Sequence, residues 1–226
     1  MQNSSPHAFT TWRSALTLAP SQQKACDDVH RLHSLVASGF RTPHPSTTEP
    51  IVRPPHVLYA AQRGAPVRYA GYRTAALPER VLVQSPTVPN WKLLLTKGHL
   101  TEARTFPVHH VLDIDDVIDV QVVANPIVRR AGRRVALATP EEGSAWLRRH
   151  LARSGLETHP HQVDPGQGVR LAGKHRQTGG TITAVYRDMA ARCRVVAPDR
   201  LAQALLQGIG PAKAYGCGLL RIRHVQ

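Results

Sequence analysis

The sequence is poor in cysteine and in long apolar runs, and each shortage excludes a class of protein. Its three cysteines form no Cys-x-x-Cys pair, which argues against a disulfide framework or a zinc ribbon and is typical of a reduced, cytoplasmic protein. No stretch approaches 18 apolar residues, and residues 1–7 lack the basic and apolar pattern of a signal peptide. We therefore expect no membrane segment and no secretion.

Acidic residues are also scarce. Fifteen Asp and Glu stand against 29 Lys and Arg, which gives a formal charge of +14, while 42% hydrophobic residues are enough for a real core. A core-forming protein this basic typically meets a polyanion, and nucleic acid is the first candidate. A generally basic proteome is the alternative, because an arginine-rich composition also follows from GC-rich coding.

The one concentrated acidic run covers residues 113–119. Carboxylates at this density are able to bind Mg²⁺. However, Ile114, Val117 and Ile118 resemble the approach to a strand, and no second acidic cluster completes a metal site. We therefore favour a solvated junction between two domains.

Residues 208–220 form a glycine-rich segment with Lys213 near its centre. Its glycines are Gly208, Gly210, Gly216 and Gly218. The segment lacks the Gly-Lys-Ser/Thr of a Walker A motif, and it leaves a helix and enters a strand, which is the reverse of the dinucleotide-binding fingerprint. Two interpretations stay open: backbone amides and Lys213 that contact phosphate, or a tight turn packed against a sheet.

The first half of the chain has the β-α-β-β-α-β pattern of a ferredoxin-like fold. The expected strands cover residues 8–19, 57–61, 80–84 and 100–108. A helix beginning near Gln22, with Ser21 as its N-cap and Gly39 at its end, carries one apolar stripe. We predict residues 8–110 as the N-terminal domain.

The second half repeats this pattern with one additional strand. The expected strands cover residues 117–127, 135–138, 181–186, 192–196 and 218–225. Thr139 and Glu142 form a capping box at the start of one helix, a second helix spans 198–207, and 159–168 is expected to be a loop. We predict residues 115–226 as a C-terminal domain of the same type, in an α+β protein of two tandem ferredoxin-like domains.

Four arginines surround Gly132 at a predicted hairpin tip. They are Arg129, Arg130, Arg133 and Arg134. Such a basic finger can enter an RNA groove or clamp phosphates, and a solvated turn is the alternative. A second basic segment, residues 169–176, contains Lys174 and Arg176.

His30 and His33 lie on the flank of the apolar stripe of the first helix. A half-sheltered imidazole is suited to general acid or base catalysis, because it titrates near pH 6.5. Among 13 histidines, a plain surface histidine is the alternative. A third interpretation has the two histidines share a metal ion with the acidic run.

Several short pieces, taken in order along the chain, match one family. They are residues 28–33, 81–86, 89–91, 124–126, 146–147 and 208–220. Together these pieces resemble the CRISPR-associated endoribonucleases that process repeat RNA in the type I-E Cascade system. The resemblance extends over residues 8–225, and its last piece is the most distinctive.

The resemblance implies two tandem ferredoxin-like (RRM-like) domains and a metal-independent reaction that needs no cofactor. In the family, a 2′-hydroxyl attacks the scissile phosphate in the repeat stem-loop of precursor CRISPR RNA, which leaves a 2′,3′-cyclic phosphate and a 5′-hydroxyl. The enzyme then keeps the guide hairpin and joins the other Cascade subunits. A catalytically silent subunit that only binds the stem-loop is the alternative.

The resemblance also implies roles for particular residues. His33 matches the catalytic histidine of the family, and His30 stands where members often carry a tyrosine. His30 is therefore a candidate for the second proton-transfer group. The arginine hairpin matches the element that contacts the RNA stem, and Lys174, Arg176 and Lys213 are further RNA-binding candidates.

Overall fold

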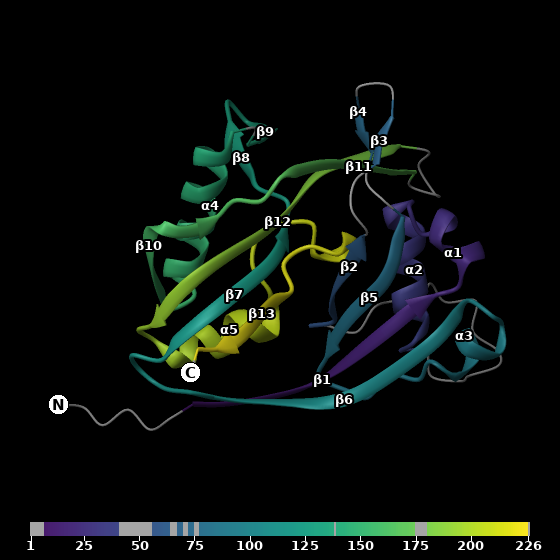
Figure 1. Cartoon of the computed structure of the whole chain (residues 1–226), viewed down its shortest axis with the longest axis horizontal. Coiled ribbons are helices and arrows are strands. Elements are labelled where there is room, and N and C mark those ends of the chain that lie inside the picture. The colour runs from purple at the N-terminus through teal and green to yellow at the C-terminus, as the bar shows by residue number, and fades with distance from the viewer. Residues whose placement is uncertain are drawn as a thin grey trace.

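The computed structural model describes residues 7–40, 56–63, 67–69, 72–74, 77–137, 139–174 and 180–225. Within these ranges the chain is a mixed α+β structure built on two antiparallel sheets (Figure 1). This agrees with the predicted α+β class. None of the helices in these ranges has the length and apolar character needed to cross a membrane.

The first sheet has the strand order β2-β5-β1-β6. Its strands are β1 (His7–Leu18), β2 (Leu58–Arg63), β5 (Pro78–Ser85) and β6 (Leu100–Leu112). The three helices that accompany this sheet are α1 (Pro20–Ala25), α2 (Val29–Ser38) and α3 (Lys92–Thr96). Leu16, Val81 and Val83 of the sheet pack with Leu32 and Val36 of α2 in one apolar cluster. The apolar stripe predicted from the sequence therefore faces the sheet.

The predicted first helix is two helices in the structure. The expectation of a single helix capped by Ser21 is wrong, because the chain breaks before Asp28 and starts again. The Asp28 carboxylate accepts hydrogen bonds from the backbone N–H of His30 (2.8 Å) and of Arg31 (3.2 Å), so Asp28 is the N-cap of α2. Gly39 follows the last residue of α2, as predicted.

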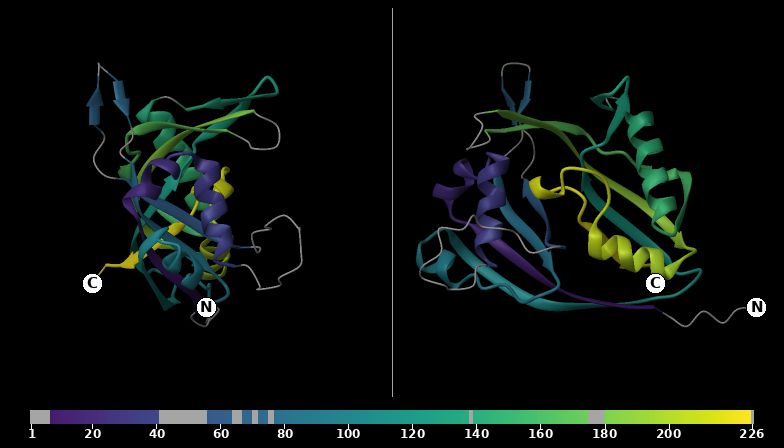
Figure 2. Two further views of the ribbon diagram at one scale, coloured as in Figure 1. Left: turned by 90° about the vertical axis from the view of Figure 1, so that its right-hand side faces the viewer. Right: turned by 180° about the vertical axis from the view of Figure 1, so that it is seen from behind.

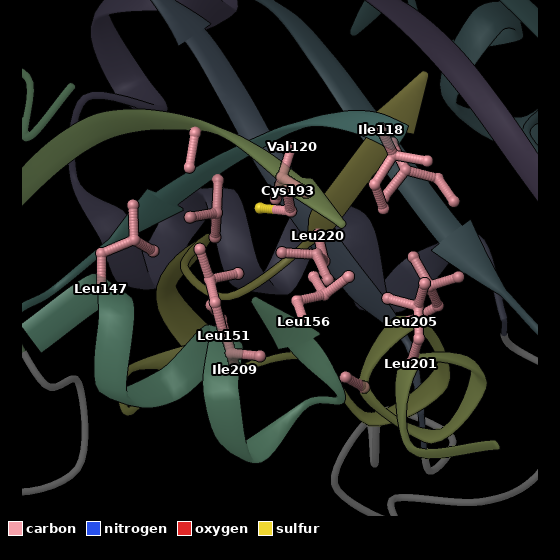
Figure 3. Close-up of a cluster of buried hydrophobic side chains, with 14 of the residues drawn as sticks. Ile118, Val120, Leu147, Leu151, Leu156, Cys193, Leu201, Leu205, Ile209 and Leu220 are labelled. Carbon is pink, nitrogen blue, oxygen red and sulfur yellow. The ribbon is translucent and has the colours of Figure 1, made fainter. Parts of the chain in front are cut away.

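The second sheet has the order β10-β12-β7-β13, and β11 also pairs with β12. Its strands are β7 (Val117–Ala124), β10 (Leu156–Asp164), β11 (Gly168–Lys174), β12 (Thr181–Val195) and β13 (Leu220–His224). Two helices, α4 (Pro140–Arg153) and α5 (Pro198–Gln207), pack with it around the larger apolar core (Figure 3). Leu147 and Leu151 of α4 and Leu205 of α5 are fully buried in this core.

The capping box predicted for α4 is present. The Thr139 hydroxyl accepts from the Glu142 N–H at 3.2 Å, and the Glu142 carboxylate accepts from the Thr139 N–H at 3.4 Å. The loop predicted for residues 159–168 is wrong over most of its length, because β10 continues to Asp164. This strand pairs with β12 at both of its ends, with an irregularity in between, which hides the strand period in the sequence.

Two small hairpins stand apart from the main sheets. One joins β3 (Val67–Tyr69) to β4 (Tyr72–Thr74), and the other joins β8 (Ile127–Arg130) to β9 (Arg133–Ala136). In the second hairpin, Ala131 and Gly132 at the tip both have positive φ, which suits a tight two-residue turn. The hairpin predicted around Gly132 is therefore confirmed.

The acidic run leads from β6 into β7 and forms ion pairs with the second sheet. The Asp119 carboxylate contacts Arg192 at 2.9 Å and Arg223 at 2.8 Å, and these hydrogen bonds hold its pKa at about 2. Asp115 pairs with Arg194 at 2.7 Å. In the part of the chain that the structure describes, no group of three or more His, Cys, Asp or Glu side chains is placed to hold a metal ion.

The two sheets are joined through buried contacts. Leu58 and Ala60 of β2 pack against Leu219, which precedes β13. The Gln84 side chain of β5 is almost fully buried and donates a hydrogen bond of 2.6 Å to the carbonyl of Leu205 in α5. These contacts fix the segment after α5 beside the first sheet and α2 (Figure 2).

Candidate functional site

His30 and His33 lie close together on α2, and both side chains are half-buried. Their ring centroids are 6.4 Å apart, with an angle of 33° between the ring planes. The Asp28 cap fixes the first turn of the helix, and Leu32 anchors its buried side in the first core. The structure therefore presents both predicted histidines on one partly accessible side of α2.

Tyr215 is a third member of this site that the sequence did not indicate. It ends the short 3-10 turn η1 (Lys213–Tyr215) in the glycine-rich segment. Its ring lies edge-to-face against His33, with the centroids 6.4 Å apart and the planes at 66°. His33 thus has both His30 and Tyr215 as ring neighbours. No local pattern reveals this neighbour, because only the packing of the second sheet against α2 brings it there.

Two buried tyrosines hold the η1 turn in place. The Tyr59 hydroxyl of β2 donates to the carbonyl of Ala214 at 2.7 Å, and the Tyr186 hydroxyl of β12 donates to the carbonyl of Tyr215. Burial raises the pKa of Tyr186 far above its ordinary value, so its hydroxyl stays protonated and remains a donor. Val29 of α2 packs in the same cluster as Tyr186. Tyr215 is therefore positioned from both sheets.

The glycines of residues 208–220 have a structural explanation. All four have positive φ: Gly208, Gly210, Gly216 and Gly218. A Cβ on Gly210 would lie 2.7 Å from the Trp146 ring, and one on Gly218 would lie 2.4 Å from the carbonyl oxygen of Ile209. Each position therefore needs glycine for both its backbone conformation and its close packing. The packed turn is the interpretation that these contacts favour.

Lys213 starts the η1 turn and is half-buried. Burial lowers the pKa of His150 in α4, and nearby positive charges, that of Lys213 among them, lower it further. Lys213 is therefore close enough to α4 for its charge to act on the His150 imidazole. Of the predicted RNA-binding residues, Lys213 is the one on the same short turn as the neighbour of His33.

The four predicted hairpin arginines project from β8 and β9, and all four are exposed. Arg129 lies opposite Arg134 in the ladder, and Arg130 lies opposite Arg133. Arg130 forms an ion pair of 2.9 Å with Glu142 at the start of α4. The hairpin stands beside α4 and apart from α2 (Figure 1), so the structure does not bring these arginines to the histidines.

Of the remaining two predicted residues, the structure describes Lys174. Lys174 is the last residue of this strand and pairs with Thr181 of β12. Arg176 lies outside the described residues.

The three cysteines are all free and buried. Burial raises the pKa of Cys26 to about 11 and that of both Cys193 and Cys217 to about 12. A thiol with such a pKa is a poor nucleophile at neutral pH, because the thiolate is the reactive form. The cysteines therefore pack in the cores and supply no candidate nucleophile.

Known proteins of one family resemble this chain in sequence. The sequence model of the family described as "CRISPR associated protein" matches residues 11–224. The CRISPR-associated endoribonuclease Cse3 of Thermus thermophilus is 34% identical over 155 residues, which is 64% of this chain and 73% of the relative.

Solved structures agree over nearly the whole chain. CRISPR endoribonuclease Cse3 bound to a 19-nucleotide RNA is 27% identical, with a TM-score of 0.73 over 94% of this chain and 99% of that one. Thermus thermophilus Cse3 bound to an RNA that represents a pre-cleavage complex is 26% identical, with a TM-score of 0.71 over 95% and 100%. Cas6e from Escherichia coli K-12 shares the fold at 21% identity, with a TM-score of 0.62 over 93% and 98%.

Proposed function

The chain belongs to the CRISPR-associated Cse3/Cas6e endoribonuclease family of type I-E, and from this membership we propose that it cleaves the repeat stem-loop of precursor CRISPR RNA. In the proposed reaction the 2′-hydroxyl next to the scissile phosphate is the nucleophile, and no metal ion or other cofactor takes part. The products are a 2′,3′-cyclic phosphate and a 5′-hydroxyl.

The observation that carries this proposal is the placement of His33. A 2′-hydroxyl must lose a proton while the leaving 5′-oxygen gains one, and an imidazole serves both needs near neutral pH. His33 is half-buried on α2 with His30 and Tyr215 each 6.4 Å away between ring centroids. We assign proton transfer to His33, the second proton-transfer position to His30, and the orientation of the His33 ring to Tyr215.

The proposed RNA-binding arginines of the β8–β9 hairpin lie apart from this centre (Figure 1). Exposed arginines on the β8–β9 hairpin suit the phosphates of a duplex stem, because RNA duplexes are recognised mainly through shape and phosphate. We propose Lys213, Lys174 and Arg176 as additional phosphate contacts. Because the hairpin and α2 lie apart, one stem would have to reach from the arginines to the scissile phosphate at His33.

We also propose that the fold is a tandem pair of ferredoxin-like domains, residues 8–110 and 115–226. The strand order supports this. In chain order, the first sheet reads second, third, first, fourth strand (β2-β5-β1-β6), and the second sheet repeats this order (β10-β12-β7-β13). The boundary would fall in the acidic turn between β6 and β7.

The partners follow from the same family membership. Related Cse3 structures hold RNA, and a CRISPR RNA-guided surveillance complex contains a chain of the same fold. We propose that this protein retains the mature guide hairpin and takes its place among the other Cascade subunits in the cytoplasm.

The proposal is tested by cleavage of the cognate repeat RNA in EDTA, with wild type, His33→Ala, His30→Ala and Tyr215→Leu compared under single-turnover conditions. Loss of the acid–base group is expected to lower the rate about 10²–10⁴-fold in His33→Ala while the affinity for the stem-loop is kept. Wild-type cleavage by His33→Ala would overturn the assignment. An RNA that wild type binds tightly and leaves uncut would favour the alternative, a catalytically silent stem-loop-binding subunit.

A further inference from the structure

A pocket of about 310 Å³ opens beside the histidines, on the side of α2 that faces α3. We call it the α2–α3 pocket. Its polar walls include His30 and Arg31 of α2 together with Lys97 and His99, which follow α3, and its apolar part includes Leu93 and Leu94. One residue, His30, therefore belongs both to this pocket and to the proposed catalytic centre.

The charge of the pocket has one sign. Arg31 and Lys97 are exposed, and none of the residues that line the pocket is acidic. Among the described residues, neither Arg31 nor Lys97 forms an ion pair with a carboxylate. The Asp28 carboxylate beside Arg31 is occupied with the backbone N–H groups at the start of α2. A cationic pocket of this kind attracts an anion.

The apolar part of the pocket is accessible. Leu93 is 52% exposed although it is a large aliphatic residue on a short helix, whereas the neighbouring Leu94 is 6% exposed and belongs to the first core. The pocket therefore offers a contact for each part of a nucleotide. The two cations can bind the phosphate, and the aliphatic surface can pack against the base.

The size and position of the pocket select the kind of nucleic acid. A cavity of about 310 Å³ is at the lower end of the range for small-ligand sites, so it accommodates a single nucleotide and excludes a duplex. His33 does not line the pocket, but His30 does, and the ring centroids of the two histidines are 6.4 Å apart. A strand whose scissile phosphate lies at His33 therefore has its next unpaired nucleotides within reach of the pocket.

We propose that the α2–α3 pocket binds an unpaired nucleotide of the RNA strand that flanks the stem, next to the scissile phosphate. Arg31 and Lys97 hold its phosphate, and Leu93 lies against its base. This inference rests on the proposed function, because it takes His33 as the site of cleavage. It adds a second recognition element, so that the enzyme reads the single-stranded flank as well as the stem.

The test measures binding without cleavage. The probes are repeat stem-loops with a 2′-deoxy nucleotide at the scissile position and with a 5′ flank, a 3′ flank or no flank. Wild type is compared with Lys97→Gln, Arg31→Gln and Leu93→Ser. The matched control is Lys92→Gln, because Lys92 is exposed at the start of α3 and does not line the pocket. Thermal unfolding of each variant reports on folding.

We expect each pocket variant to weaken binding of the RNA with one of the two flanks by about five- to tenfold, which is the effect of removing one interaction with a phosphate or a base. Binding of the flankless stem-loop should change less than about twofold, and Lys92→Gln should leave all three affinities unchanged. The flank that responds identifies the strand in the pocket. An equal loss for flanked and flankless RNA, no loss for either flank, or an equal loss in Lys92→Gln would each overturn the proposal.

These outcomes are separate from the outcome for catalysis. Because the probes cannot be cleaved, the binding result stands whether or not His33→Ala is inactive. If His33→Ala cleaves normally and the flank still binds through Lys97, the proposed catalytic role is wrong and the pocket remains. If His33→Ala is inactive and no flank responds, the pocket assignment alone fails.

Discussion

The substitution Gly218→Ala tests how tightly the glycine-rich segment is packed. Gly218 has a φ of +86°, and a Cβ there would lie 2.4 Å from the carbonyl oxygen of Ile209. Two backbone hydrogen bonds fix the position of Gly218. Its N–H donates to the Val123 carbonyl at 2.8 Å, and its carbonyl accepts from the Ile209 N–H at 3.0 Å. The backbone has little freedom to move away from the new methyl group.

The expected loss has two parts. A residue with a Cβ in the left-handed region loses about 1–2 kcal/mol, and an added methyl group that the surroundings must accommodate removes about 1–3 kcal/mol more. Part of this is offset by about 0.4–1 kcal/mol, because alanine restricts the unfolded chain. We expect Gly218→Ala to lower the free energy of unfolding by about 3 kcal/mol, and a chain of this length then loses about 6–12 °C in Tm.

Urea unfolding followed by circular dichroism measures this loss, and Gly98→Ala is its matched control. Gly98 also has positive φ, at +65°, but nothing lies within 4 Å of the place its Cβ would take. We expect this control to lose only about 1 kcal/mol, from backbone strain alone. Equal losses in the two variants would refute the reasoning, because the close approach to Ile209 would then contribute nothing.

Two further predictions concern RNA binding and pH. In a plot of log Kd against log salt concentration, replacing both Arg129 and Arg134 by Gln should lower the slope by about one for each phosphate contact that is lost. The control is Arg194→Gln, at an exposed arginine that is ion-paired with Asp115, and it should leave the slope unchanged. Burial, with Arg13 and His224 nearby, lowers the pKa of His110 from 6.5 to about 4. Because the unfolded state takes up the proton first, wild type should lose stability as the pH falls from about 6.5 to about 4, and this loss should be smaller in His110→Gln. An unchanged urea midpoint between pH 7 and pH 4 in wild type would contradict this, and His161→Gln, at an exposed position, is the control.

Features that depend on neighbours in the sequence were predictable. The capping box of α4 needs only Thr139 and Glu142, and both the end of α2 at Gly39 and the end of α5 at Gly208 follow from the preference of glycine for helix ends. The β8–β9 hairpin follows from a glycine at its tip between two basic stretches. In each case the physical cause lies within a few residues.

The errors have causes that the local pattern does not contain. The apolar stripe runs across both α1 and α2 with helical spacing, so it conceals the break that the Asp28 side chain makes by capping α2. The polar stretch around Pro160 gives no strand period, yet its ends pair with β12. Secondary structure there is decided by the partner strand.

The candidate site divides in the same way. His33 and His30 were predicted as a pair, because they are three residues apart on a helix, and the structure places them together. Tyr215 was not predicted, because its contact with His33 depends on Tyr59, Tyr186 and the docking of two sheets. The α2–α3 pocket likewise needs α3 to lie beside α2.

The buried thiols make this protein unusually convenient for optical labelling. Cys26, Cys193 and Cys217 are each at most 2% exposed, and their raised pKa values keep them in the unreactive thiol form at neutral pH. A single cysteine introduced at the exposed hairpin tip, by Gly132→Cys or Ala131→Cys, would therefore take a maleimide dye without removal of the native three. If the hairpin contacts the RNA stem as proposed, fluorescence from that dye would report the binding of the stem in real time.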